Sequence, residues 1–330
     1  MKKLILGAAA AILWASSALA EPAVIYDMGG KADKSFNEAA FNGAERYKKE
    51  TGTEYKEFEI QNDAQREQAM RRFARDGANP VVVIGFSQAA ALEKVAEEFP
   101  DTQFAIVDMV VDKPNVRSVV FKEQEGSYLA GVMAAKASKS GTVGFVGGMD
   151  IPLIRKFACG YAQGVKSVNP DAKVIVNMTG TTPAAWNDPV KGGEITKTQI
   201  DQGADVVYAA AGSTGLGVLQ MAADSGALSI GVDSNQNYLH PGKVLTSMTK
   251  GVDTAVYNAF KDSADGKFTP GFSVLGLKEG GVDVAMDDNN KPLVDEEMMA
   301  AVAKARSDIE SGAVTVHDFT SDNACPSFDS

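Results

Sequence analysis

Short, almost wholly apolar runs alternate with segments of helical periodicity along nearly the whole chain. Residues 80–85, Pro-Val-Val-Val-Ile-Gly, form one such run, and the helical segment that follows them ends before Pro100. A strand that is apolar at every position is buried on both faces, as in a parallel sheet that helices cover on both sides. The alternation therefore predicts an α/β fold built on parallel sheets.

The predicted elements fall into two series, which indicates two α/β lobes. The first series has strands at 23–27, 55–60, 80–85, 103–108 and 116–121, and helices at 36–50, 65–75 and 88–99. The second has helices at 126–138, 153–168, 192–202 and 215–224, and strands at 142–147, 173–178, 205–211, 228–233 and 243–248. A helix at 251–264 and a tail with segments at 272–277, 282–285 and 295–311 remain to be shared between the lobes.

No Pro/Gly/Ser-rich linker separates the two series, so we expect the chain to pass between lobes near 121–125 and 248–251. We assign residues 21–122 plus about 251–271 to the first lobe. Residues 123–250 plus about 272–330 form the second. Several strands that cross between lobes would make a hinge, and a cleft that closes on a ligand is typical of binding proteins.

The first 20 residues have the form of a secretory signal peptide. Lys2 and Lys3 precede an apolar stretch that reaches Trp14, and Ala18-Leu-Ala20 follows. The apolar stretch is shorter than the roughly 20 residues that span a bilayer, so export is favoured over a membrane anchor. We expect cleavage after Ala20 and a periplasmic protein. No Cys stands at the cleavage point, so we expect no lipid anchor.

Composition narrows the range of partners. The chain has 32 Lys and Arg against 43 Asp and Glu, and two of the Lys lie in the leader, which leaves 30 − 43 = −13 behind it. This acidity argues against nucleic acid and anionic membrane surfaces as partners, and a monomer is the default expectation.

Two cysteines, Cys159 and Cys325, lie behind the leader. In an oxidising compartment such a pair often forms a disulfide, and the alternative is two unpaired thiols, one of them buried. Geometry decides between these alternatives.

Catalytic and metal-binding patterns are weak. His240 and His317 lack metal-ligand spacing, and no Gly-x-Ser-x-Gly sequence is present. The segment 212–217, Gly-Ser-Thr-Gly-Leu-Gly, lacks the lysine of a phosphate-binding loop. Asp27 and Asp33 could serve acid–base chemistry, but acids at strand ends commonly accept hydrogen bonds or cap helices. We therefore expect no enzyme activity, metal or cofactor.

Polar and aromatic residues gather where the predicted strands end. After the first strand, Asp27-Met-Gly-Gly leads to Ser35-Phe36-Asn37 at the start of a helix. The carboxyl ends of strands in an open α/β sheet line the ligand crevice. Comparable motifs stand at 104–108, 125–131, 186–192, 211–215, 230–236 and 246–250.

Taken together and in this order, these motifs resemble the basic membrane protein family of substrate-binding proteins. This family contains the purine nucleoside receptor of bacterial ABC transporters, and the resemblance covers essentially the whole chain behind the leader. It implies a type I periplasmic-binding-protein fold, with two doubly wound α/β lobes joined by a hinge of several strands. It also implies a purine nucleoside or nucleobase as ligand, and a membrane permease of an ABC importer as partner.

The resemblance further implies roles for seven residues. Phe36 would stack on one face of the base, and Asn37 and Asp108 would meet its edge. Trp186 would form a second aromatic wall, and Gly212 would bring backbone close to the sugar. Asp233 and Lys250 would bind the ribose hydroxyls.

Each of these residues also has a purely structural alternative. Phe36 could pack against its helix, and Asn37 could cap it. Asp108 and Asp233 could cap turns, Trp186 could be a surface aromatic, and Lys250 a solvated hinge residue. Two rival functions stay open. One is an exported nucleoside-processing enzyme with Asp27 or Asp233 on the sugar, and the other is a type I binding protein for a sugar or another ring-bearing ligand.

Overall fold

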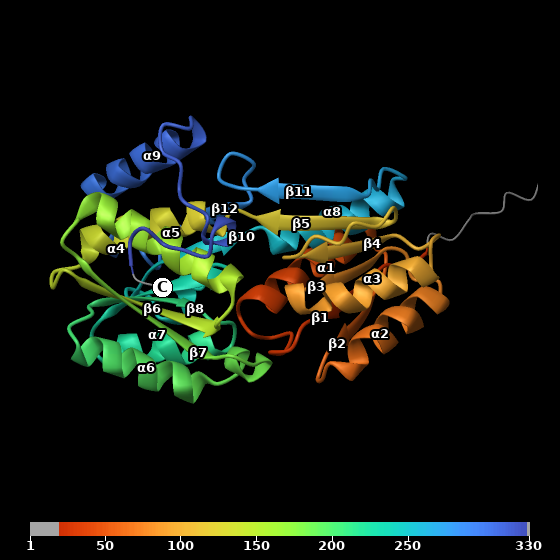
Figure 1. The fold of residues 1–330 in the computed structure, drawn as a ribbon, viewed down its shortest axis with the longest axis horizontal. Coiled ribbons are helices and arrows are strands. Elements are labelled where there is room, and N and C mark those ends of the chain that lie inside the picture. Colours follow the sequence, from red (N-terminus) through yellow and green to blue (C-terminus); the bar gives the residue numbers. More distant parts are fainter. Residues whose placement is uncertain (1–19, 329–330) are drawn as a thin grey trace, which may run out of the picture.

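The computed structural model describes residues 20–328, which form two α/β lobes that lie side by side (Figure 1). The predicted leader lies outside the described residues, apart from its last residue. Among the residues described, no helix combines the length and the apolar character needed to cross a bilayer.

The first lobe contains a six-stranded sheet in the order β11-β5-β4-β3-β1-β2, with every neighbouring pair parallel. Its strands are β1 (Ala23–Tyr26), β2 (Lys56–Glu59), β3 (Val81–Ile84), β4 (Phe104–Val107), β5 (Val116–Phe121) and β11 (Gly271–Leu275). Its helices are α1 (Phe36–Thr51), α2 (Ala64–Arg75), α3 (Ala89–Glu98) and α8 (Val252–Ala264).

The central strands of this sheet are buried on both faces, as their unbroken apolar runs predict. In β1, Val24 and Tyr26 pack into the core on the side of α1 and α8. Ala23 and Ile25 pack into a second core on the side of α2 and α3. Because side chains alternate between the two faces of a strand, an apolar residue is required at every position.

The second lobe contains a six-stranded sheet in the order β12-β10-β9-β8-β6-β7, in which only β12 runs antiparallel to its neighbour. Its strands are β6 (Thr142–Met149), β7 (Lys173–Gly180), β8 (Val206–Ala210), β9 (Leu228–Asp233), β10 (Val244–Lys250) and β12 (Val282–Val284). Its helices are α4 (Glu123–Ala137), α5 (Pro152–Val168), α6 (Pro189–Asp201), α7 (Thr214–Asp224) and α9 (Glu296–Glu310).

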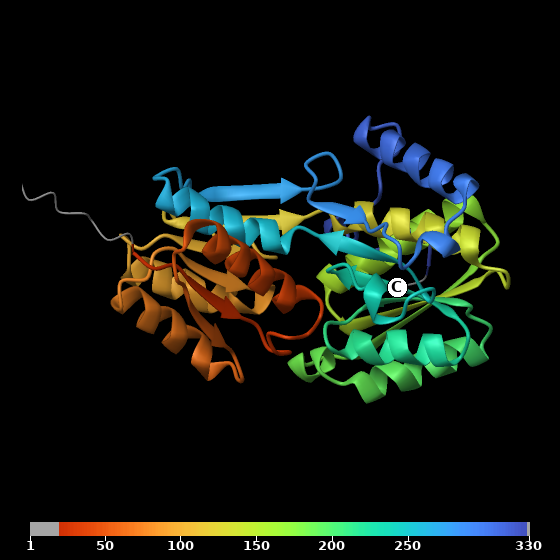
Figure 2. The ribbon, with the colours of Figure 1, turned by 180° about the vertical axis from the view of Figure 1, so that it is seen from behind.

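The chain passes between the sheets at three places: after β5, after β10, and between β11 and β12 (Figure 2). The third crossing differs from the expected boundary, because β11 pairs with β5 from Gly271↔Arg117 to Leu275↔Phe121. The second lobe therefore resumes after Leu275 rather than at residue 272. Helix α8 packs on α1, and the strand that follows it, β11, forms an edge of the first sheet. Sequence periodicity does not reveal which sheet this strand joins.

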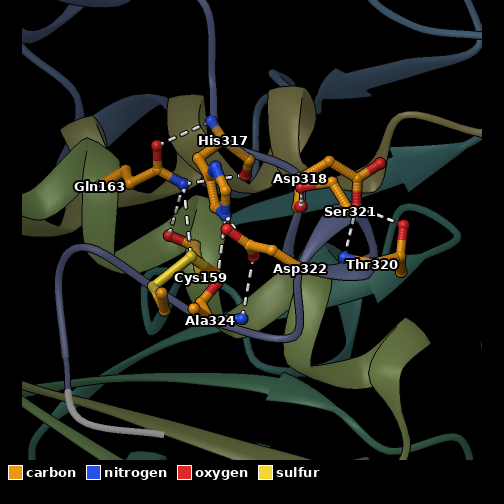
Figure 3. The surroundings of a disulfide bond; sticks show 9 residues. Cys159, Gln163, His317, Asp318, Thr320, Ser321, Asp322 and Ala324 are labelled. Carbon is orange, nitrogen blue, oxygen red and sulfur yellow. Dashed lines mark hydrogen bonds and ion pairs between the residues drawn. A yellow bond between two sulfur atoms is a disulfide. The ribbon is translucent and has the colours of Figure 1, made fainter.

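The C-terminal segment lies against α5 and is joined to it by a disulfide between Cys159 and Cys325, with an S–S distance of 2.15 Å (Figure 3). Of the two alternatives left open by the sequence, the structure has the bonded one. The amide of Gln163 makes two further bonds to the segment: its Oε1 accepts from His317 N at 2.8 Å and its Nε2 donates to His317 O at 3.1 Å. The buried side chain of Phe319 completes the attachment.

Candidate functional site

A cavity of about 630 Å³, counting the part open to solvent, lies between the lobes at the carboxyl ends of both sheets. Its walls come from the segments after β1, β3 and β4 of the first lobe and from β8, β9, β10, α5 and the 3₁₀ helix Pro183–Trp186 of the second. This is the expected position, because ligands of open α/β sheets bind at the carboxyl ends of the strands. All seven residues named from the sequence line it: Phe36, Asn37, Asp108, Trp186, Gly212, Asp233 and Lys250.

Apolar side chains that the sequence reasoning missed also line the cavity. They are Phe86, Leu153, Ile154 and Phe157. The last three lie on one face of α5, and their spacing is that of any buried helix, so nothing in the sequence marks them as cavity residues.

The two aromatic residues named from the sequence come from opposite lobes. Phe36 is the first residue of α1 and is half-buried, and Trp186 ends the 3₁₀ helix Pro183–Trp186 and is also half-buried. Gly212 lies beside Trp186, because a Cβ on Gly212 would lie 3.3 Å from the Trp186 carbonyl oxygen. Its φ of +56° also favours glycine at this position.

Asn37 is engaged with the loop that follows β1. Its Nδ2 donates to the carbonyl oxygens of Asp27 and Gly30, both at 3.2 Å, and its Oδ1 accepts from Asp27 N at 3.1 Å. Both donor hydrogens of the amide are therefore used within the protein, so only an Oδ1 lone pair remains for a ligand. Asn37 thus shapes the 27–30 turn, and it also lines the cavity.

Asp33 caps α1. Its carboxylate accepts from the backbone N–H groups of Ser35 at 2.8 Å and of Asn37 and Glu38, each at 3.0 Å. Burial nevertheless raises the pKa of Asp33 to about 7, against the opposing effect of these hydrogen bonds. The sequence reasoning allowed Asp33 to be a cap, and this is the role that its contacts support.

Asp108 directly follows β4 and has a φ of +73°. Its Oδ2 accepts from Lys250 Nζ at 2.7 Å, and its Oδ1 is buried without a hydrogen-bond partner among residues 20–328. Burial raises the pKa of Asp108 to about 6, although the charge of Lys250 lowers it. A buried acceptor without a partner is costly unless a ligand supplies a donor.

Lys250 ends β10, and 1% of its side chain is exposed. Besides Asp108, its ammonium contacts Glu123 Oε1 at 2.9 Å, and it lies 5.2 Å from the ring centroid of Phe36. Burial lowers the pKa of Lys250, but the charges of Asp108, Glu123 and Asp233 outweigh this effect and raise it. The lysine is therefore a paired, buried cation rather than a solvated hinge residue.

Glu123 joins this site to the interior of the second lobe. Its Oε2 lies 2.8 Å from the ammonium of Lys156, which also donates to Phe121 O at 2.9 Å. Lys156 reaches Asp318 in the C-terminal segment at 3.9 Å. Sequence reasoning missed Glu123 and Lys156, because one was placed before its helix and the other in the middle of an amphipathic helix.

Asp233 ends β9 and has a φ of +64°. Its Oδ2 accepts from Ser35 Oγ at 2.5 Å, across the two lobes. Burial raises the pKa of Asp233, although Lys250 and the Ser35 hydroxyl lower it. Positive φ values are uncommon for non-glycine residues, and both Asp108 and Asp233 have one where a strand ends at the cavity.

Within residues 20–328, no group of three or more His, Cys, Asp and Glu side chains could hold a metal ion. The polar groups of the cavity are carboxylates, the Asn37 amide, one paired ammonium and backbone. Between aromatic and aliphatic walls, this arrangement suits a flat ligand that carries N–H or O–H donors.

Comparison with known proteins identifies the family. A family model described as "ABC transporter substrate-binding protein PnrA-like" matches residues 20–317. The chain belongs to the Bmp family of ABC-transporter substrate-binding proteins. This confirms the resemblance found in the motifs.

Two Bmp relatives illustrate the match. The ABC transporter nucleoside-binding protein BmpA of Lactococcus lactis is 36% identical, over 89% of this chain and 88% of that protein. Basic membrane protein A1 of Borrelia garinii is 33% identical, over 75% of this chain and 74% of that protein.

Solved structures agree on the fold. An ABC transporter solute-binding protein from Aeropyrum pernix aligns with a TM-score of 0.83 at 29% identity, covering 91% of this chain and 93% of that one. An arabinose-binding protein from Geobacillus stearothermophilus aligns with a TM-score of 0.63 at 12% identity, covering 84% of this chain and all of that one, a likeness of fold alone. The type I periplasmic-binding-protein fold is confirmed.

Proposed function

We propose that this Bmp-family protein binds a purine nucleoside in the interlobe cavity and delivers it unchanged to the permease of an ABC importer. One observation carries the proposal. The cavity brings the half-buried rings of Phe36 and Trp186 together with the buried carboxylates of Asp108 and Asp233. Each of these two carboxylates has only one oxygen engaged by a side chain. A purine nucleoside has flat apolar faces at one end and vicinal hydroxyls at the other.

The chemistry of each part fits this ligand. Phe36 and Trp186 would stack on the base, and each stack contributes about 1–3 kcal/mol. The unpartnered Oδ1 of Asp108 would accept an N–H of the base edge. Asp233 would accept the ribose hydroxyls, and Lys250 would donate to the same oxygens. Asn37 would hold the turn beneath the base and offer its remaining Oδ1 lone pair to the base edge.

The relatives support the same proposal. BmpA of Lactococcus lactis is named as nucleoside-binding, and this chain covers most of its length. Relatives from three Pyrococcus species are named as lipoproteins. Glu21, and not a cysteine, follows the predicted cleavage site of this chain, so we propose a periplasmic protein without a lipid anchor.

Calorimetric titration with inosine tests the proposal, when the same samples are assayed for free hypoxanthine. We expect saturable binding with no release of the base. Release of hypoxanthine would instead identify a nucleoside-processing enzyme.

Titrations with ribose and with arabinose serve as controls for the sugar-binding alternative. We expect neither sugar to displace bound inosine at similar concentration. Binding of a free sugar to the empty protein, with no binding of inosine, would contradict the nucleoside assignment.

A further inference from the structure

We propose that Ser35 is a positioning residue that orients Asp233 for the ribose and does so only when the lobes are closed. This inference rests on the proposed function. Ser35 lies on the first lobe and is fully buried, and Asp233 lies on the second. The hydroxyl of Ser35 donates to Asp233 Oδ2 at 2.5 Å, so one oxygen of this carboxylate is held and the other is left for a ligand hydroxyl.

The helix next to Ser35 does not use its hydroxyl. Ser35 precedes α1 at the N-cap position, where a serine side chain ordinarily bonds a backbone N–H of the first turn. Here the Ser35 side chain makes no such bond. Asp33 takes that role instead, and it also accepts from Ser35 N at 2.8 Å. Asp33 therefore fixes the backbone of Ser35, and the Ser35 hydroxyl points across the cleft to Asp233.

The second lobe also donates hydrogen bonds to the backbone carbonyl groups of Lys34 and Ser35. Ser234 Oγ donates to Ser35 O at 2.9 Å, and Gln236 Nε2 donates to Lys34 O at 2.9 Å. All of these bonds cross between the lobes, so a rotation that opens the cleft separates their partners. In an open protein Asp233 has lost its Ser35 donor, and closure restores the donor and selects one orientation of the carboxylate.

The contact also affects the charge of Asp233. A hydroxyl that donates to a carboxylate favours its ionised form, which is the form that accepts two vicinal hydroxyls. Asp233 is buried, and burial opposes ionisation. Ser35 therefore supports the acceptor at the sugar end of the cavity, while the base end depends on other residues.

The test compares Ser35→Ala with a matched control, Ser234→Ala, which removes the interlobe hydrogen bond to Ser35 O and no hydrogen bond of the Asp233 carboxylate. Affinities for inosine and hypoxanthine are measured by calorimetry. We expect Ser35→Ala to weaken inosine by about ten- to a hundredfold, the usual effect of losing a hydrogen bond to a charged group, and hypoxanthine much less. Ser234→Ala should weaken both ligands by the same small factor.

Two further variants separate positioning from a structural role. In an Asp233→Ala background, Ser35→Ala should add almost nothing to the loss of inosine affinity, because the two residues act as a unit. Ser35→Thr keeps the hydroxyl and should restore part of the affinity. If Ser35→Ala fails to fold, Ser35→Gly serves instead, because glycine is well tolerated at an N-cap, and the same bias toward inosine is expected.

The inference is overturned if Ser35→Ala weakens inosine and hypoxanthine equally, or if its effect adds fully to that of Asp233→Ala. The unmodified protein distinguishes this result from a failure of the proposed function. If it binds no nucleoside at all, the proposed function is wrong and the role of Ser35 is wrong with it.

Discussion

The indole ring of Trp186 occupies the space in which residue 148 would carry a side chain. A Cβ on Gly148 would lie 2.2 Å from Cζ3 of Trp186 and 2.4 Å from Cε3, far inside contact distance. Gly148 belongs to β6, and the φ there is not in the left-handed region, so space and not backbone conformation requires the glycine. The cavity wall formed by Trp186 therefore depends on the absence of a side chain on the neighbouring strand.

Gly148→Ala should move the Trp186 ring and weaken purine binding by up to about tenfold, the lower part of the range for loss of one stacking contact. The sequence has two tryptophans, and Trp14 is lost when residues 1–20 are removed. Tryptophan fluorescence of the shortened protein therefore reports on the surroundings of Trp186 alone. We expect a shifted emission maximum in the variant. Gly193→Ala is the control, because a Cβ there would make only ordinary contacts, 3.5 Å or longer. Unchanged emission and affinity in Gly148→Ala would refute this account.

Phe36→Ala should lower purine affinity by about ten- to a hundredfold and leave the melting temperature of the ligand-free protein almost unchanged. The reason is that Phe36 is half-buried and lines the cavity. A core role would instead cost about 3–5 kcal/mol of stability. Phe41→Ala, a half-buried phenylalanine of the same helix that does not line the cavity, should leave affinity unchanged. Loss of stability with retained affinity in Phe36→Ala would place the ring in the core.

Glu123→Gln should destabilise the protein by about 3–5 kcal/mol, because it leaves two buried ammonium groups with one partner fewer. Chemical denaturation measures this change. Adding Lys156→Met should recover part of the loss, since one of the two cations is removed. Lys136→Met breaks an ion pair with the exposed Glu297 and should change stability by less than about 1 kcal/mol. Equal losses of stability in Glu123→Gln and Lys136→Met would show that the buried ion pairs of Glu123 contribute no more than an exposed pair.

Asp33 should make stability depend on pH. Its folded pKa, about 7, lies above the ordinary value of 3.8, so between these values the folded protein binds more protons than the unfolded chain. The free energy of unfolding should therefore fall as pH rises from about 4 to about 7, by at most about 1.4 kcal/mol per pH unit for one proton. Asp33→Asn removes the titrating group and keeps an acceptor for the cap. The free energy of unfolding, measured by chemical denaturation at each pH, should depend less on pH in the variant. The same pH dependence in both proteins would show that Asp33 does not titrate in this range.

Ligand binding should also close the lobes. Three crossings join them, and several hydrogen bonds already connect the two sides of the cleft, among them Ser213 Oγ to Gly29 O at 3.1 Å. We expect the radius of gyration measured by X-ray scattering to fall when protein stripped of ligand by partial unfolding is saturated with inosine. Identical profiles would mean that the lobes do not move.

The sequence predicted central strands such as Val81–Ile84 and Val206–Ala210, because burial on two faces demands apolar residues at every position. It could not assign β11, whose exposed Phe272 and Val274 lie on an edge strand that either sheet could have taken. Partners far apart in the chain were equally hidden. Nothing near Ser35 indicates that its hydroxyl meets a residue 198 positions away.

The same limit applies to the polar residues of the site. Position at a strand end was enough to bring Asp108 and Asp233 to the cavity, because all parallel strands end at the same edge. What each polar atom contacts was not predictable. Asn37 has the residue type of a ligand contact, and its amide is engaged with the turn. Lys156 has the residue type of a surface lysine, and it is buried against Glu123.

The return of the chain to the first lobe at β11 has a consequence for synthesis. The first sheet lacks its edge strand until residue 275 has left the ribosome, when most of the second lobe has already been made. We therefore expect the first lobe to reach its stable fold only near the end of translation, together with the second lobe. Limited proteolysis of chains truncated after residue 264 would check this, because a resistant first lobe in such a chain would show that it needs no later segment.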